Sequence, residues 1–163
     1  MKAALIFYSF SGNTKRVIEH IKEKLVLKSI EVETFETKPL YETGNFFKQC
    51  FEAVSKTKPL LAGQLDYDLR EFDFILVASP VWAFNIAPAL RSYLDKAENI
   101  KDKKIFCLLT YGSGTGSQKA LKELKDILRQ KGANPVSSVL LAGHKTKNKN
   151  YLEEKLKAAD IGA

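Results

Sequence analysis

Continuous apolar runs constrain the fold of this chain more than any other feature of its sequence. Four of them cover residues 2–8 (KAALIFY), 72–79 (FDFILVAS), 103–110 (KKIFCLLT) and 135–143 (PVSSVLLAG). Such runs are typical of strands that are buried on both faces, where no polar alternation is needed. A fifth segment, 29–36 (SIEVETFE), alternates apolar residues with glutamates, as an edge strand with one wet face would.

Segments with helical periodicity separate these runs. Their apolar or small residues recur at intervals of three and four positions, as on one face of an α-helix. The five sets are Thr14, Val17, Ile18, Ile21 and Leu25; Phe46, Phe47, Cys50, Phe51 and Val54; Leu90, Leu94 and Ala97; Leu121, Leu124, Ile127 and Leu128; and Leu152, Leu156 and Ala159.

The regular alternation of strands and helices predicts the architecture. Buried strands joined by helices form an α/β fold, a three-layer α/β/α sandwich around a five-stranded parallel sheet with right-handed crossovers. We expect the strand order 2-1-3-4-5. Ligands of such sheets bind beyond the carboxyl ends of the strands where the order reverses, which places a site after the first and third strands.

Length and composition are those of an ordinary globular domain. The chain has 163 residues, 45% hydrophobic and 28% charged, and we expect one domain over residues 1–163. No apolar run approaches the roughly 20 residues that cross a bilayer, and the N-terminus turns polar too soon for a signal peptide. We therefore expect a cytoplasmic protein that does not bind membranes, with Cys50 and Cys107 as packing residues.

The charge is the one unusual bulk property. Lys and Arg number 26 against 19 Asp and Glu, a formal net charge of +7. A basic surface suits nucleic acid or an acidic partner. No basic block is interleaved with aromatic residues, and KTKNKN at 145–150 is typical of a solvated loop. The pattern disfavours nucleic acid.

A cluster of small hydrogen-bonding residues follows the first predicted strand. Ser9, Ser11, Gly12, Asn13 and Thr14 lie between that strand and the first helix. Backbone N–H groups at a helix start lack partners and attract anions, glycine allows close approach, and the hydroxyls can donate to phosphate oxygens. The cluster predicts a phosphate site.

The same cluster allows other interpretations. Ser11 or Asn13 could simply cap the helix, although one residue would suffice for that. The lysine follows the threonine instead of preceding it, which disfavours a P-loop nucleoside triphosphatase. Ser79 ends the third strand where a response-regulator receiver would carry an aspartate, so that class is disfavoured too.

Two further loops follow the third and fourth predicted strands. SPVWAFNIAPAL places Trp82 and Phe84 at the ligand edge, where we expect them to be exposed and Trp82 to cover a flat heterocycle. As an alternative, both could pack on a neighbouring loop. TYGSGTG, residues 110–116, has three glycines whose bare backbone can approach a ring, with Tyr111 as another aromatic face, or it is a tight turn before the fourth helix.

With these three loops, the chain resembles the flavodoxin family. SFSGNT is similar to that family's phosphate loop, and SPVWAFNIAP and TYGSGTG are similar to its loops on the two faces of the isoalloxazine ring. The resemblance covers essentially the whole chain and implies a flavodoxin-like fold with non-covalent FMN. The implied cofactor-binding residues are Ser9, Phe10, Ser11, Gly12, Asn13, Thr14, Pro80, Val81, Trp82, Ala83, Phe84, Asn85, Thr110, Tyr111, Gly112, Ser113, Gly114 and Gly116.

The resemblance leaves the activity open. Electron-carrying flavodoxins are usually acidic whereas this chain is basic, and its aromatic loop resembles the short-chain SPVW branch. We favour an electron-transfer carrier, because Trp82 and Tyr111 would cover both ring faces and no nicotinamide site is identifiable. The alternatives are an FMN-dependent NAD(P)H oxidoreductase and a basic binding module without flavin.

The carrier interpretation needs no catalytic side chain or metal. His20 and His144 are interpreted as surface or packing residues, and the acidic stretch 66–73 as a solvated turn. As partners we expect redox proteins, acidic ones on grounds of charge. We expect a monomer or a weak dimer.

Overall fold

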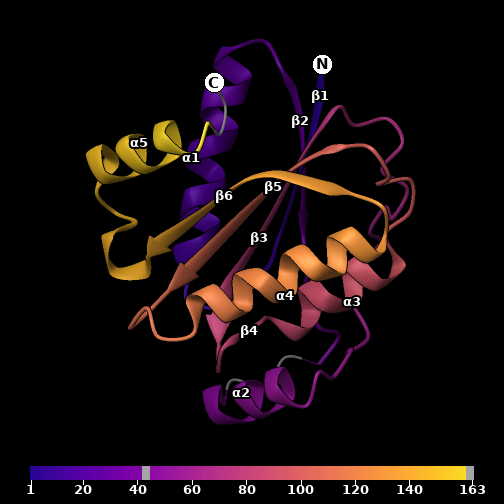
Figure 1. Ribbon diagram of the computed structural model, residues 1–163, viewed down its shortest axis with the longest axis vertical. Helices are drawn as coiled ribbons and strands as arrows, with labels where there is room; N and C mark the ends of the chain where they lie inside the picture. The colour runs from indigo at the N-terminus through magenta and orange to yellow at the C-terminus, as the bar shows by residue number, and fades with distance from the viewer. Residues whose placement is uncertain (42–44, 161–163) are drawn as a thin grey trace.

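Strands and helices alternate along the chain in the computed structural model, which describes residues 1–41 and 45–160 (Figure 1). The elements are β1 (Lys2–Phe7), α1 (Asn13–Leu27), β2 (Glu31–Glu36), α2 (Phe46–Val54), β3 (Phe74–Trp82), β4 (Asn85–Ile86), α3 (Pro88–Lys96), β5 (Lys104–Tyr111), α4 (Ser117–Gln130), β6 (Asn134–Ala142), the 3-10 helix η1 (Gly143–Lys145) and α5 (Lys149–Ala158).

The sheet has the predicted topology. Its order is β2-β1-β3-β5-β6, with every neighbouring pair on this path parallel. Counted along the chain without β4, this is the expected order 2-1-3-4-5, which is confirmed. The two-residue strand β4 was not expected: it pairs antiparallel with the end of β3, Val81 opposite Ile86 and Trp82 opposite Asn85.

Two cores lie on opposite faces of the sheet. On one face, Ala3 and Leu5 of β1 pack with residues of α1 and α5, including Ile18 and Leu156. On the other face, alternate residues of the same strands pack with α3 and α4, as Ile75 does. Figure 1 shows α1 and α5 on one side of the sheet and α2, α3 and α4 on the other. Burial on both faces explains why the strands are continuous apolar runs.

The two cysteines differ in burial. Cys107 is fully buried in the core, and burial raises the pKa of its thiol to about 12, so the packing interpretation is confirmed for it. Cys50 is half-buried.

The carboxylates of the acidic stretch 66–73 accept hydrogen bonds from within the stretch and from other parts of the chain. Asp68 accepts hydrogen bonds from Asn99 and from the Arg70 backbone, while the Lys2 backbone donates to Asp73. Within the described residues, no helix is long and apolar enough to cross a membrane.

A buried ion pair ties α3, α4 and β4 together. Arg91 Nη2 lies 2.7 Å from Glu123 Oε1, and the two side chains are only 6% and 15% exposed. The other carboxylate oxygen of Glu123 accepts the backbone N–H of Ile86 at 2.9 Å. Arg91 Nη2 also reaches the carbonyl of Ala53 at the end of α2. One carboxylate thus fixes the short antiparallel hairpin against two helices.

This geometry predicts a large stability loss for Glu123→Ala. The substitution leaves the Arg91 guanidinium buried without its counter-ion, which typically costs about 3–5 kcal/mol of unfolding free energy. The measurement is urea denaturation followed by circular dichroism. Asp126→Ala is the control, because Asp126 lies one turn further along α4 in exposed ion pairs worth about 0–1 kcal/mol. Similar small losses for both variants would contradict a structural role of the pair.

Candidate functional site

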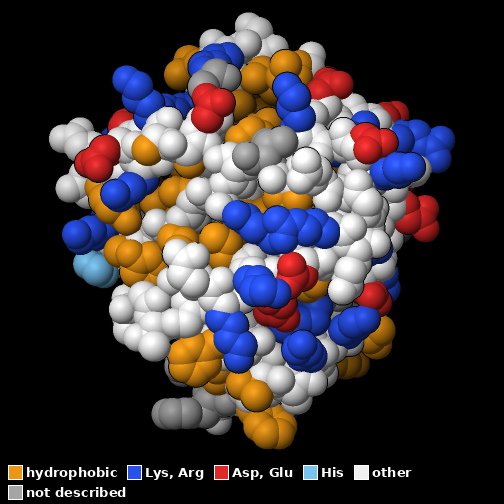
Figure 2. Space-filling view, in the orientation of Figure 1, with side chains coloured by type: hydrophobic (Ala, Val, Ile, Leu, Met, Phe, Trp, Pro, Cys, Tyr) orange, Lys and Arg blue, Asp and Glu red, His pale blue; other side chains and the backbone are white. Residues whose placement is uncertain are grey.

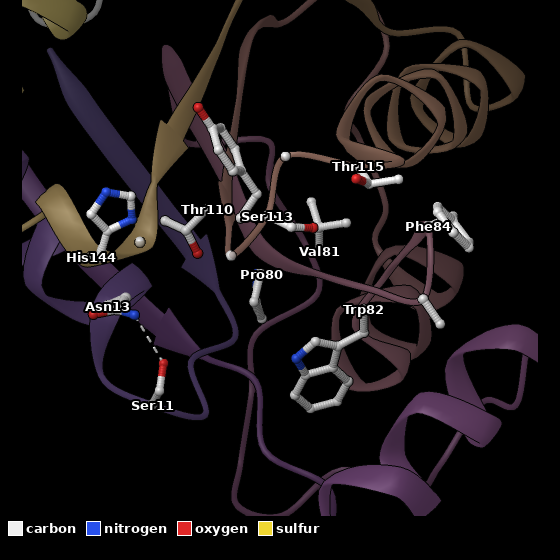
Figure 3. Close-up of a pocket in the computed structure, with 15 residues that line it drawn as sticks. Ser11, Asn13, Pro80, Val81, Trp82, Phe84, Thr110, Ser113, Thr115 and His144 are labelled. Atoms are coloured by element: carbon white, nitrogen blue, oxygen red, sulfur yellow. Dashed lines mark hydrogen bonds between the residues drawn. The ribbon is translucent and has the colours of Figure 1, made fainter.

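A cavity of about 680 Å³ opens at the carboxyl edge of the sheet, where the loops after β1, β3, β5 and β6 meet (Figure 3). It brings together most of the residues predicted from the three loops. Those that line it are Ser11, Asn13, Pro80, Val81, Trp82, Ala83, Phe84, Thr110, Tyr111, Gly112, Ser113 and Gly114. The predicted residues outside its lining are Ser9, Phe10, Gly12, Thr14, Asn85 and Gly116.

Two lining residues were missed by the sequence analysis, Gly143 and His144, while Thr115 belongs to the predicted loop 110–116 and also lines the cavity. His144 was interpreted as a surface or packing residue, and it is exposed at the rim of this cavity. The sequence could have placed these residues at the site, because the fifth parallel strand must end at the same edge of the sheet as the others. The packing interpretation holds for His20, whose Nε2 lies 2.9 Å from Glu153 Oε1 of α5.

The start of α1 presents unpartnered backbone donors. Gly12 adopts a left-handed conformation, φ 81°, and nothing lies within 4 Å of the position that a Cβ would take. Within the described part of the chain, the N–H groups of Gly12, Asn13 and Thr14 make no hydrogen bond. The next N–H, of Lys15, is satisfied by Ser9 Oγ at 3.1 Å. Free N–H groups at the positive end of a helix dipole fit an anion such as phosphate.

The hydroxyls of this loop are arranged differently from the sequence-based expectation. Thr14 is 1% exposed, and its Oγ1 lies 2.8 Å from Thr110 Oγ1, so this hydroxyl faces the core and links the loop to β5. Ser9 Oγ accepts the backbone N–H of Lys15 in the first turn of α1 instead. Ser11 Oγ accepts a hydrogen bond from Asn13 Nδ2 at 3.2 Å, which leaves the Ser11 hydroxyl proton free to donate toward the cavity (Figure 3).

Trp82 is not the exposed cover that the sequence suggested. Its side chain is buried, 6% exposed, and packs edge-on against Tyr8 and Phe10 at centroid distances of 5.1 and 5.8 Å. The alternative interpretation, packing on a neighbouring loop, describes Trp82 better, because a large apolar ring gains more from burial than from exposure at a rim. Phe84 is exposed as expected, to 44%.

The turn between β3 and β4 carries backbone strain. Ala83 and Phe84 have φ values of 44° and 69°, a left-handed conformation that is unfavourable for residues with a Cβ. Asn85 Nδ2 donates to the Ala83 carbonyl at 2.6 Å and supports the turn. The Phe84 ring lies against Gly116, where an added Cβ would come 1.8 Å from Phe84 Cδ1. Gly116 is therefore required to seat this ring.

The end of β6 locks the start of α1 in place. Thr146 Oγ1 donates to the Gly143 carbonyl at 2.8 Å, and Arg16 Nη1 donates to both Asn13 Oδ1 and Thr146 Oγ1 at 3.2 Å. A Cβ on Gly143 would lie 3.0 Å from Asn13 Nδ2. Asn13 is thus held between α1 and the loop after β6, with His144 beside it (Figure 3).

The described residues that line the cavity carry no fixed charge. None of them is Asp, Glu, Lys or Arg, and the ionisable side chains among them are those of Tyr111 and His144. Within the described ranges, no group of three or more His, Cys, Asp and Glu side chains could hold a metal ion. An uncharged wall beside a set of free helix N–H groups fits a flat uncharged ring joined to a phosphate.

Comparison with known proteins agrees with this geometry. A family model described as NADPH-dependent FMN reductase matches residues 1–147. No curated protein matches the sequence.

Solved structures share the fold. A flavoprotein in complex with FMN from Lactobacillus acidophilus NCFM is 21% identical with a TM-score of 0.69, over 91% of this chain and 98% of that one. Flavodoxin 2 from Bacillus cereus is 18% identical, TM-score 0.66, over 99% and 97%. An azoreductase from Bacillus anthracis str. Sterne is 19% identical, TM-score 0.63, over 98% and 99%. At these identities the likeness establishes a flavodoxin-like fold, as the resemblance implied.

The contact between Phe84 and Gly116 predicts a specific sensitivity. Gly116→Ala should displace the Phe84 ring and lower stability by more than the roughly 1 kcal/mol expected for left-handed strain alone. Gly63→Ala is the matched control, since Gly63 has nearly the same φ, 78° against 77°, and nothing within 4 Å of an added Cβ. Thermal unfolding of the two variants measures the difference. Equal destabilisation would mean that the ring moves aside freely.

Proposed function

The chain belongs to the NADPH-dependent FMN reductase family, and from this premise we propose that it is an FMN-dependent NAD(P)H oxidoreductase. The family assignment gives FMN as the cofactor of the site. The observation that carries the proposal beyond the family is the burial of Trp82, which lies in the cavity wall but packs edge-on against Tyr8 and Phe10.

The burial of Trp82 bears on the choice between carrier and oxidoreductase. A hydride donor must stack its nicotinamide on an open face of the flavin, whereas an electron carrier needs only an exposed ring edge. The carrier hypothesis relied on Trp82 and Tyr111 covering both faces. With the Trp82 side chain only 6% exposed, that cover is reduced on its side, which supports the oxidoreductase.

The residues present fit FMN. The N–H groups of Gly12, Asn13 and Thr14, with the Ser11 hydroxyl, would hold the phosphate. The loops after β3 and β5 would hold the ring in the uncharged cavity. When bound, FMN would supply the hydride-transfer chemistry, while the protein would supply binding, orientation and electrostatics.

The chain's own residues position the cofactor and handle protons. The bond between Thr14 and Thr110 fixes the distance between the phosphate loop and the ring loop. Arg16 holds Asn13 in place by donating to Asn13 Oδ1. Proton exchange near the ring would fall to His144, Tyr111 or solvent, because none of the described lining residues is a carboxylate or a lysine.

Direct reduction by NADPH tests the proposal. Anaerobic, FMN-loaded protein mixed with excess NADPH should lose its flavin absorbance within seconds, with no added reductase. Free FMN with NADPH in the same buffer is the control and should bleach far more slowly. A flavin that dithionite bleaches and NADPH leaves oxidised for minutes would instead favour the electron carrier.

Phosphate recognition at α1 predicts a ligand-selective effect of Ser11→Ala. Loss of one charge-assisted hydrogen bond costs about 1.5–3 kcal/mol, so FMN affinity should fall about ten- to a hundred-fold. Riboflavin, which has no phosphate, should bind as before. Ser113→Ala is the comparison, since Ser113 lines the cavity on the β5 loop and should affect both ligands alike. Fluorescence titration of the apoprotein measures all four affinities, and an equal loss of both ligands in Ser11→Ala would refute the phosphate site.

A further inference from the structure

A second cavity, of about 860 Å³, adjoins the first one. It lies between the end of α2 and the helices α3 and α4, and Ala83 and Phe84 line both cavities. The strained turn between β3 and β4 therefore forms the boundary between them. We call this second cavity the lysine-rimmed recess.

The recess differs from the first cavity in its charge. The described residues of its walls include six cationic side chains, Lys56, Lys58, Arg91, Lys119, Lys122 and Lys131, against three carboxylates, Asp95, Glu123 and Asp126. Figure 2 shows Lys and Arg side chains gathered around a few carboxylates on the face of the molecule where α4 lies. The formal balance of the walls is six minus three, or +3. The described lining of the first cavity has no such fixed charge.

Each carboxylate of the recess already has a cationic partner within the wall. Glu123 binds Arg91 at 2.7 Å, Asp126 binds Lys122 at 2.6 Å and Asp95 binds Lys58 at 2.6 Å. Lys131 donates to the backbone carbonyls of Asp95 and Ala97, which carry no formal charge. The positive excess therefore falls on Lys56, Lys119 and Lys131.

Two further features indicate a ligand at this place. Arg91 is buried, yet among the described residues its Nη1 has no hydrogen-bond partner, and a buried guanidinium N–H left unpaired is costly. Lys119 Nζ lies over the Phe84 ring, 5.9 Å from its centroid, at the boundary with the first cavity. One cation thus stands where a ligand would pass from the recess to the flavin cavity.

We propose that the lysine-rimmed recess binds the phosphate groups of the nucleotide hydride donor while its nicotinamide occupies the first cavity. A pyridine dinucleotide joins a ring to a charged diphosphate, and the two cavities present the matching pair of surroundings side by side. The 2′-phosphate of NADPH adds negative charge, so the excess of +3 should favour NADPH over NADH. This inference rests on the proposed oxidoreductase function.

The test measures binding without turnover. FMN-loaded protein is titrated with NADP⁺ by calorimetry, in wild type, in Lys56→Gln/Lys119→Gln and in the control Lys22→Gln/Lys157→Gln. The control also removes two positive charges, but from exposed positions on α1 and α5, across the sheet from the recess. We expect NADP⁺ affinity to fall at least ten-fold in the recess variant and to be unchanged in the control. Inorganic pyrophosphate should compete with NADP⁺ in the wild type, and NAD⁺ should bind less tightly.

Dihydronicotinamide riboside provides a second measurement, because it donates a hydride and has no phosphate. It should reduce the flavin of all three proteins at the same rate. Any of three results would overturn the recess as a phosphate site. These are equal NADP⁺ affinity in the two double variants, no NADP⁺ binding by the wild type, and no competition by pyrophosphate. A lower rate with the riboside in the recess variant would also overturn it, since the lysines would then act on the flavin cavity itself.

The outcomes separate the recess from the function on which it rests. Lysine-dependent NADP⁺ binding without flavin bleaching by NADPH would support the recess as a phosphate site and refute the oxidoreductase. Bleaching by NADPH that is unaffected by the recess variant would support the oxidoreductase and refute the recess. Binding of an acidic protein in place of NADP⁺ would likewise refute the recess as a nucleotide site.

Discussion

Burial of the central strands on both faces is the constraint on which the rest of this structure depends. Residues 3–6 of β1, 75–78 of β3 and 105, 107–109 of β5 are at most 1% exposed. Parallel neighbours buried in this way can be joined only by crossovers that run over the sheet, so helices must cover both faces. It follows that the carboxyl ends of all these strands lie at one edge. The candidate site is a consequence of that geometry before any particular side chain is considered.

The hairpin of β3 and β4 then divides that edge into two compartments. Its left-handed residues, Ala83 and Phe84, cost conformational energy that the surroundings must offset. Glu123 accepts a hydrogen bond from the backbone N–H of Ile86, and Gly116 leaves space for the Phe84 ring. Strain that is held by buried interactions at a cavity wall is characteristic of functional sites, where a ring or loop must be kept in one position.

The sequence predicted the strands, the helices, their order and three of the site loops, because these follow from local periodicity and from the behaviour of parallel sheets. It could not predict β4, whose two residues are defined by pairing with β3 and by Glu123, far along the chain. The burial of Trp82 depends on Tyr8 and Phe10, which sequence spacing does not place beside it. Helical periodicity located α2 correctly, yet Phe51 and Val54 on it are 72% and 58% exposed, so periodicity alone did not identify the buried face.

The positive charge of the chain is distributed unequally between the two cavities. A net charge of +7 spread evenly would act on any anion, and salt would screen it over about 10 Å. Instead, among the residues that the structure describes, the lining of the cavity with the helix N–H groups has no fixed charge, while that of the adjoining recess has an excess of +3. Cations in a recess keep more of their strength than cations on a convex surface, because low-dielectric walls focus their field. In the proposed oxidoreductase, this arrangement would let the phosphates of the donor determine affinity and leave the uncharged cavity free for stacking between the two rings.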